Sequence, residues 1–183
     1  MNQKPDSLHI YLIRHASPDW SRTDIPYDIP PGPPLLVKGE HEAELLGVFI
    51  RQAGLKKLYH SPLERTKRTA QIIAQVAGIG LQEDLSLAEW RSDENAQLVG
   101  VRLLPTWEKV IAECEHVGSI GLVTHGGPIT VLLRHLGMDQ DTLGGFCHTF
   151  DHHNPLPPAG VWLAKRDVDS PDWDLSLVFT PPI

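Results

Sequence analysis

The sequence is poor in the features that define several classes of protein. Its 183 residues include only two cysteines, Cys114 and Cys147, with neither CxxC spacing nor the number that a disulfide framework needs. We expect free thiols in a reducing compartment, which favours a cytoplasmic location. No apolar run approaches the roughly 20 residues of a membrane span, and the first apolar run is too short for a signal-peptide core. The composition therefore predicts a soluble protein.

The chain also lacks an excess of positive charge. Its 16 lysine and arginine residues are outnumbered by 23 aspartate and glutamate residues, which gives a net charge of −7. Proteins that bind nucleic acid over a broad surface need the opposite balance, so we expect no nucleic-acid partner and no membrane partner. A small basic pocket is still allowed, because the local potential depends on a few converging side chains. Length and a hydrophobic content of 41% predict one domain over residues 1–183.

Short apolar runs predict the strands. The run LHIYLI at 8–13 and the run IGLV at 120–123 contain no turn residue and indicate buried strands. A shorter strand is expected at 57–59. Near the C-terminus, 161–164 and 175–179 flank a turn sequence and predict a two-stranded hairpin. These runs alternate with stretches of helical spacing along most of the chain.

Helices are predicted between these strands, one of them in the segment THGGPITVLLRHLG after the run at 120–123. Apolar spacing indicates one helix over 38–52, and another is expected over 103–117. The stretch SPLERTKRTAQIIAQVAG predicts a helix with Ser61 as N-cap, Glu64 at the third position and Gly78 at its end. Alternation of strands and helices predicts an α/β protein, a three-layer α/β/α sandwich with a mostly parallel central sheet.

Ionisable side chains stand where these elements end or begin. Arg14 and His15 follow the first strand, and Arg65 lies at the start of the SPLER helix. Glu89 follows the segment LSLA, and His125 follows the buried run GLVT. Because the carboxyl ends of parallel strands meet at one edge of a sheet, we expect the five side chains to converge.

Such a set is suited to phosphoryl transfer without a metal. A guanidinium group can bind two phosphate oxygens at once through a bidentate pair of hydrogen bonds, and it keeps its charge. A neutral imidazole can accept a phosphoryl group as a nucleophile, and a second imidazole can stabilise its oxygens. A carboxyl group can protonate the leaving oxygen, and Glu83 and Glu94 are alternatives to Glu89 for that role. The run HTFDHHN at 148–154 lacks the spacing of metal ligands, so we predict no metal site.

Several short motifs resemble those of the histidine phosphatase superfamily, the phosphoglycerate-mutase-like proteins. They occur in the family's order and spacing within residues 8–137. They are RHA at 14–16, LLVKGEHEAELLG at 35–47, SPLERTKRTA at 61–70, LAE at 87–89 and THGG at 124–127.

The resemblance implies a role for each of the five residues. His15 would be the phosphorylated nucleophile, held in a pocket with Arg14, Arg65 and His125. Glu89 would act first as general acid and then as the base that activates water. The resemblance implies no metal and no organic cofactor.

The sequence departs from the family pattern at a few positions. Ala16 stands where the family has glycine, and Val37 stands where it has threonine. Ser21 replaces the asparagine that follows Trp20, and we expect its hydroxyl to donate to phosphate. The segment RSDENAQLVG after Glu89 also differs from the family's usual run.

A phosphatase is favoured over a mutase, because mutases carry larger insertions that close over the substrate. The predicted function is therefore hydrolysis of a small-molecule phosphoester through phospho-His15. A phosphohistidine protein would fit as substrate too. A catalytically silent phosphate-binding module and a phosphoglycerate-type mutase stay open as alternatives, and so does a homodimer.

Overall fold

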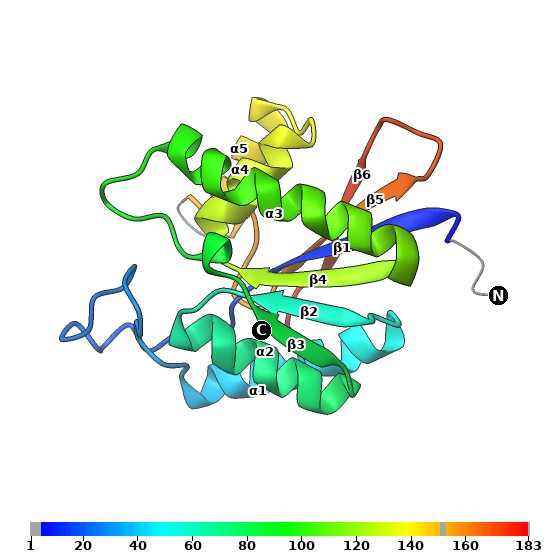
Figure 1. Cartoon of the computed structure of the whole chain (residues 1–183). Coiled ribbons are helices and arrows are strands. Elements are labelled where there is room, and N and C mark those ends of the chain that lie inside the picture. The colour runs from blue at the N-terminus through cyan, green and yellow to red at the C-terminus, as the bar shows by residue number, and fades with distance from the viewer. Residues whose placement is uncertain (1–4, 151–152, 183) are drawn as a thin grey trace.

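The computed structural model describes residues 5–150 and 153–182. In this part of the chain a mixed sheet of six strands has the order β3-β2-β4-β1-β5-β6 (Figure 1). The parallel strands are β1 (Ser7–Arg14), β2 (Lys57–His60), β3 (Gly80–Glu83) and β4 (Ser119–Thr124). The antiparallel edge hairpin is formed by β5 (Val161–Asp167) and β6 (Asp174–Phe179). This arrangement confirms the predicted α/β class with a mostly parallel sheet.

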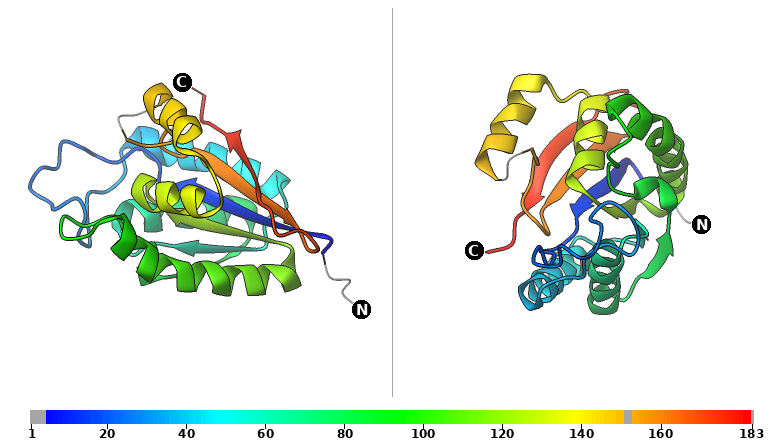
Figure 2. Two further views of the ribbon diagram at one scale, coloured as in Figure 1. Left: turned by 90° about the horizontal axis from the view of Figure 1, so that it is seen from above. Right: turned by 90° about the vertical axis from the view of Figure 1, so that its left-hand side faces the viewer.

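Helices cover both faces of the sheet, which gives three layers (Figures 1 and 2). One face carries α1 (Val37–Gln52) and α2 (Glu64–Ala77). The other face carries α3 (Ala96–Val117), α4 (Gly126–His135) and α5 (Gln140–Thr149). A short 3-10 turn, η1 (Leu85–Leu87), connects β3 to the loop before α3.

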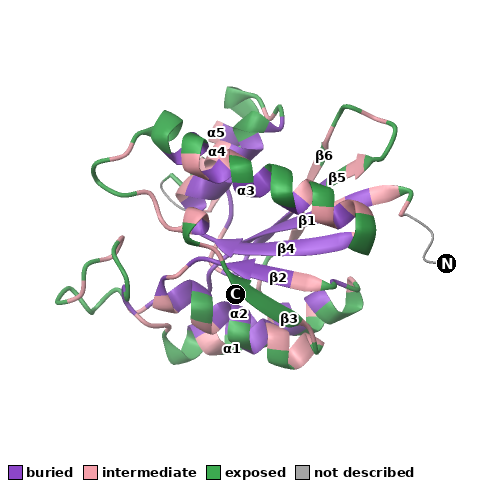
Figure 3. Ribbon diagram, viewed as in Figure 1, coloured by how far each residue is buried: buried purple, intermediate pink, exposed green. Residues whose placement is uncertain are grey.

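Strand β1 shows why the apolar run is nearly continuous. Alternate side chains of a strand point to opposite faces of the sheet. Leu8, Ile10 and Leu12 pack into the core beneath α3 and α4. Tyr11 and Ile13 pack into the core beneath α1 and α2. Because helices cover both faces of the sheet, side chains on either face of β1 must be apolar. Figure 3 shows β1 and β4 buried along most of their length.

The predicted N-terminus of α2 is wrong. The helix begins at Glu64 with Leu63 as N-cap, and no side chain caps it. Leu63 is extended, with ψ of 142°, so the chain from Ser61 has not yet entered the helix. The hydroxyl of Ser61 lies 2.8 Å from Nε2 of His125 instead. Ser61, which has the sequence features of a helix cap, therefore contacts His125 at the edge of the sheet where the strands end.

Helix α3 begins earlier than its apolar spacing predicted. Asn95 is the N-cap, and its side chain accepts a hydrogen bond of 3.0 Å from the amide of Leu98. Pro105 was expected in the first turn, yet it lies inside the helix. The carbonyl that loses its donor to this proline belongs to Val101, a residue 66% exposed, so water can reach it. The helix therefore continues through the proline.

Two further sequence predictions concern the C-terminal third and the thiols. His148 of the HTFDHHN run lies in α5, a helix that the sequence did not indicate, while Asp151 and His152 lie outside the described residues. Cys114 and Cys147 are both free thiols, as predicted.

Among the described helices, none has the length and apolar character required to cross a membrane.

Candidate active site

The register of the parallel strands brings the two predicted histidines together. Arg14, the last residue of β1, pairs with Thr124, the last residue of β4. A histidine directly follows each strand. The amide of His15 donates to the carbonyl of Thr124 at 3.0 Å. The imidazole centroids of His15 and His125 are 5.2 Å apart. Adjacent strand ends therefore place both rings at one point of the sheet edge.

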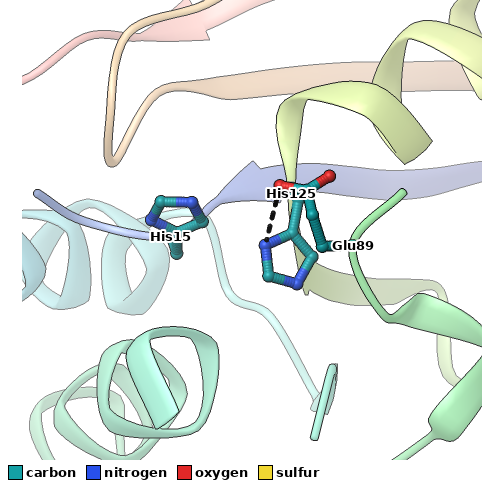
Figure 4. Close-up of side chains that lie close together, drawn as sticks. All are labelled: His15, Glu89 and His125. Carbon is teal, nitrogen blue, oxygen red and sulfur yellow. Dashed lines mark ion pairs between the residues drawn. The ribbon is translucent and has the colours of Figure 1, made fainter. Parts of the chain in front are cut away.

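Arg65 and Glu89 complete this cluster from other elements. Nη2 of Arg65, in the first turn of α2, donates to Nδ1 of His125 at 3.1 Å. Oε2 of Glu89, just after η1, lies 3.5 Å from both Arg65 and His125. Figure 4 shows Glu89 beside His125 with the ring of His15 nearby. Arg14 is also buried there, and its Nη1 donates to the carbonyl of Leu156 at 2.9 Å.

The hydrogen bonds define the tautomers of the two rings. Nδ1 of His15 lies 2.8 Å from the carbonyl oxygen of Ala16, which can only accept, so Nδ1 carries the proton. The lone pair on Nε2 of His15 is then available as a nucleophile. Arg65 can only donate, so Nδ1 of His125 accepts and its Nε2 donates to the hydroxyl of Ser61. Both rings are neutral in this arrangement.

Burial shifts the proton affinities in directions that suit these roles. Burial, and then the charges of Arg65 and Arg14, hold the pKa of His15 well below its ordinary value. The pKa of His125 is lowered in the same way, first by burial and then by Arg65. Burial raises the pKa of Glu89, although the amide of the next residue and the two arginines oppose the shift. The surroundings therefore favour the neutral form of His15, and they let Glu89 keep its proton to a higher pH than an exposed glutamate would.

The two alternative carboxylates are placed elsewhere. Glu94 accepts a hydrogen bond of 2.7 Å from Arg102, which lowers the pKa of Glu94 to about 2. Such a group stays ionised and cannot serve as an acid near neutral pH. Glu83 lies on the exposed edge strand β3. Of the three candidates, Glu89 alone lies against the histidines.

The cluster is suited to an anion rather than to a metal ion. His15, Glu89 and His125 each offer one ligand atom within 4.8 Å of the others, a spacing that a cation could use. However, the charges of Arg14 and Arg65 lower both histidine pKa values, which shows a potential that repels cations. Nε of Arg65 is buried and has no hydrogen-bond acceptor among the described residues. A phosphoryl oxygen would supply an acceptor to this guanidinium.

Comparison with known proteins finds a family match in the region that holds most of these residues. The sequence profile of the histidine phosphatase superfamily (branch 1) matches residues 10–98, which include Arg14, His15, Arg65 and Glu89. Over these residues the chain is similar to the histidine phosphatase superfamily. His125, the fifth member of the cluster, follows the matched region and joins the others through the strand register.

Individual curated proteins and solved structures are similar to the chain as well. The "Probable phosphoglycerate mutase GpmB" of Salmonella typhi is 38% identical over 82 residues, which are 45% of this chain and 38% of the relative. A phosphoglycerate mutase from Bacillus anthracis superimposes with a TM-score of 0.76 at 15% identity, over 96% of this chain and 94% of that one. A mycobacterial glucosyl-3-phosphoglycerate phosphatase gives 0.71 at 19% identity, over 93% and 97%. These structures show the shared fold.

Tyr27 is a residue at the site that the sequence did not indicate. The guanidinium of Arg65 lies 3.9 Å from the centre of the Tyr27 ring, and its Nη1 donates to the Tyr27 carbonyl at 2.7 Å. The Tyr27 hydroxyl is 3.4 Å from Nε2 of His15. Trp20 stacks on the outer face of Tyr27, with centroids 4.6 Å apart. Tyr27 lies in the proline-rich loop at 17–35, and only the length of this loop is typical of a functional segment.

The structure does not bring Ser21 to this cluster. Ser21 is exposed, and its hydroxyl donates to the carboxylate of Asp19 at 2.6 Å. Its amide contacts the same carboxylate at 3.0 Å, so the serine closes a local turn. The predicted role of Ser21 in phosphate binding has no geometric support in this conformation of the loop.

A second layer of contacts fixes the turn that follows His15. The amide of Ala16 donates to the hydroxyl of Thr69 at 3.1 Å. The amide and hydroxyl of Ser17 both donate to the buried carboxylate of Glu42 at 2.8 Å. A Cβ at Gly39 would lie 2.2 Å from the Ser17 carbonyl oxygen, so this contact requires glycine. Helices α1 and α2 thus fix the backbone on the C-terminal side of His15.

Proposed function

We propose that the protein is a phosphomonoesterase that hydrolyses small-molecule phosphoesters through a phosphohistidine on His15. One observation carries the proposal. The unprotonated Nε2 of His15, the guanidiniums of Arg14 and Arg65 and the Glu89 carboxyl group, whose pKa is raised by burial, lie close together where β1 and β4 end. Nucleophile, anion-binding groups and proton donor are the parts that this reaction needs.

In the first step Nε2 of His15 attacks phosphorus, and the bond from phosphorus to the ester oxygen breaks. The carboxyl group of Glu89 gives its proton to that oxygen, so the leaving group departs as an alcohol. The guanidinium groups of Arg14 and Arg65 stabilise the charge on the transferred oxygens. His15 is then phosphorylated and Glu89 is ionised.

In the second step water replaces the alcohol. The Glu89 carboxylate takes a proton from this water as its oxygen attacks phosphorus, and the bond from phosphorus to Nε2 of His15 breaks. Inorganic phosphate leaves, and both residues return to their starting protonation states. No proton or electron remains unaccounted for, so the residues of the site are sufficient.

The proposal is tested by phosphate release from p-nitrophenyl phosphate. We expect turnover by the purified chain at neutral pH, with the same rate in the presence of a chelator such as EDTA, because side chains supply every charge needed. A rate that falls in EDTA and returns with a divalent metal would contradict the side-chain mechanism. Absence of any turnover would favour the phosphate-binding module.

A phosphoglycerate mutase is the second candidate. Relatives with that name share 38% identity with part of this chain, although the chain spans only 38% of their length. A mutase would move the phosphoryl group of a phosphoglycerate between hydroxyl positions without net release of phosphate. Phosphorus NMR of the products distinguishes the two reactions.

Tyr27 must move before a phosphoryl group can enter the site. Its ring covers the Arg65 guanidinium, and its hydroxyl lies near Nε2 of His15. Both His15 and Arg65 are at most 1% exposed. We expect Tyr27→Ala to bind orthovanadate about tenfold more tightly, because the anion no longer competes with the ring. Tyr27→Phe keeps the ring and separates the effect of the hydroxyl. Weaker binding by Tyr27→Ala would instead make Tyr27 a contact of the bound anion.

A further inference from the structure

A cleft opens beside the site where two loops meet. It has a volume of ≈ 500 Å³ and is lined by residues 28–30 on one side and by Ala88 and 91–93 on the other. Figure 1 shows both loops at the end of the molecule to which β1 and β4 point. The amide of Ser92 donates to Asp28 at 3.3 Å, so the two loops are in direct contact.

The proposed reaction places the leaving group at this cleft. Glu89 protonates the ester oxygen, so the organic part of the substrate must begin within hydrogen-bond distance of Glu89. Ala88, which lines the cleft, directly precedes Glu89. Asp28, on the opposite wall, directly follows Tyr27, which covers Arg65. The two walls of the cleft are therefore adjacent in the chain to Glu89 and to Tyr27.

The charged groups of the cleft are mainly hydrogen-bond acceptors. Asp28 and Asp93 contribute two carboxylates, whereas Arg91 is the one cationic side chain of the lining. Arg91 already pairs with Asp93 at 3.3 Å and with Glu94 at 3.8 Å. This differs from the phosphate site itself, where two guanidiniums face a single carboxyl group. The lining therefore keeps a net negative charge even with Arg91 paired to Asp93, and it favours hydroxyl or ammonium groups over a second anion.

We infer that the preferred substrates are phosphate monoesters of neutral or cationic alcohols that carry further hydroxyl or amino groups. The inference rests on the proposed function, because the position of the leaving group follows from the role of Glu89. It disfavours bisphosphates and phosphoglycerates, whose additional anionic group would face Asp28 and Asp93. The phosphatase and mutase functions therefore predict opposite preferences.

A matched pair of esters tests the inference. Glycerol 3-phosphate and 3-phosphoglycerate have the same carbon skeleton and differ by a hydroxymethyl group in place of a carboxylate. We expect kcat/KM to be at least about tenfold higher for glycerol 3-phosphate, the effect of a like charge within several Å of the cleft carboxylates. Titration calorimetry with both esters makes the same comparison for binding and needs no turnover.

Substitutions in the cleft locate the cause of the preference. Asp28→Asn keeps an acceptor for the Ser92 amide but removes a charge, and we expect it to reduce the preference severalfold. Asp93→Asn should act in the same direction, and the double variant should remove most of the preference. Asp24→Asn is the matched control, because Asp24 lies in the same loop, pairs with Arg22 at 2.8 Å and does not line the cleft.

The outcomes separate this inference from the proposed function. Equal use of both esters, or preference for 3-phosphoglycerate, would overturn the inference even if p-nitrophenyl phosphate is hydrolysed. An unchanged preference in the Asp28 and Asp93 variants would overturn it as well. If no ester is hydrolysed the proposed function fails, and the calorimetric comparison still decides whether the cleft selects against a second anion.

Discussion

His15→Ala is expected to lose phosphate release by on the order of 10⁴-fold or more, since the substitution removes the attacking atom. The residual groups could still bind phosphate, because Arg14 and Arg65 do not depend on the imidazole for their positions. Arg14 is held by the carbonyl of Leu156 and Arg65 by that of Tyr27. We therefore expect orthovanadate affinity to fall much less than turnover.

A covalent intermediate gives this prediction a second readout. Phosphohistidine is stable in alkali and labile in acid, so wild type denatured in alkali during turnover should retain label from a radioactive phosphoester. His15→Ala should retain none. His9→Ala is the matched control, since His9 lies near the opposite end of the same strand, and we expect a rate close to wild type. Equal labelling of the His15 variant would assign the intermediate to another side chain.

The fold and the convergence of the five predicted cluster residues could be predicted because they depend on local patterns. Apolar runs end in polar residues at 14 and 124, and parallel pairing necessarily brings such ends together. The glycines after His125 allow a helix to begin there, and Arg65 lies in the first turn of its helix. These relations need only strand direction and helix position, which sequence patterns carry.

The remaining features depend on contacts between segments far apart in the chain. Tyr27 reaches Arg65 only because the proline-rich loop folds back over α2, and no periodicity indicates that path. Ser61 had the features of a helix cap, but its hydroxyl bonds His125 across the sheet edge. Ser21 aligned with a family position, yet the bond to Asp19 turns it away. Tertiary contacts override local preference at these positions.

Glu89→Gln is expected to lower turnover of alkyl phosphates by about 10²- to 10⁴-fold, since their alkoxides leave poorly without a proton. Loss for p-nitrophenyl phosphate should be much smaller, because p-nitrophenolate leaves without protonation. Glutamine keeps the size of the side chain, so the contacts with Arg65 and His125 change little in shape. The ratio of the two rates therefore reports proton donation rather than misfolding.

The pH dependence provides the decisive form of this experiment. The pKa of Glu89 is raised and the acid must be protonated, so the rate for alkyl phosphates should fall as pH rises through that pKa. The pKa of His15 is lowered and the nucleophile must be neutral, so the rate should also fall as pH drops through it. Glu89→Gln should lose only the alkaline limb, while ionisation of the substrate affects both proteins equally. Glu83→Gln, on the exposed edge strand, is the control, and loss of the alkaline limb in that variant would reassign the acid.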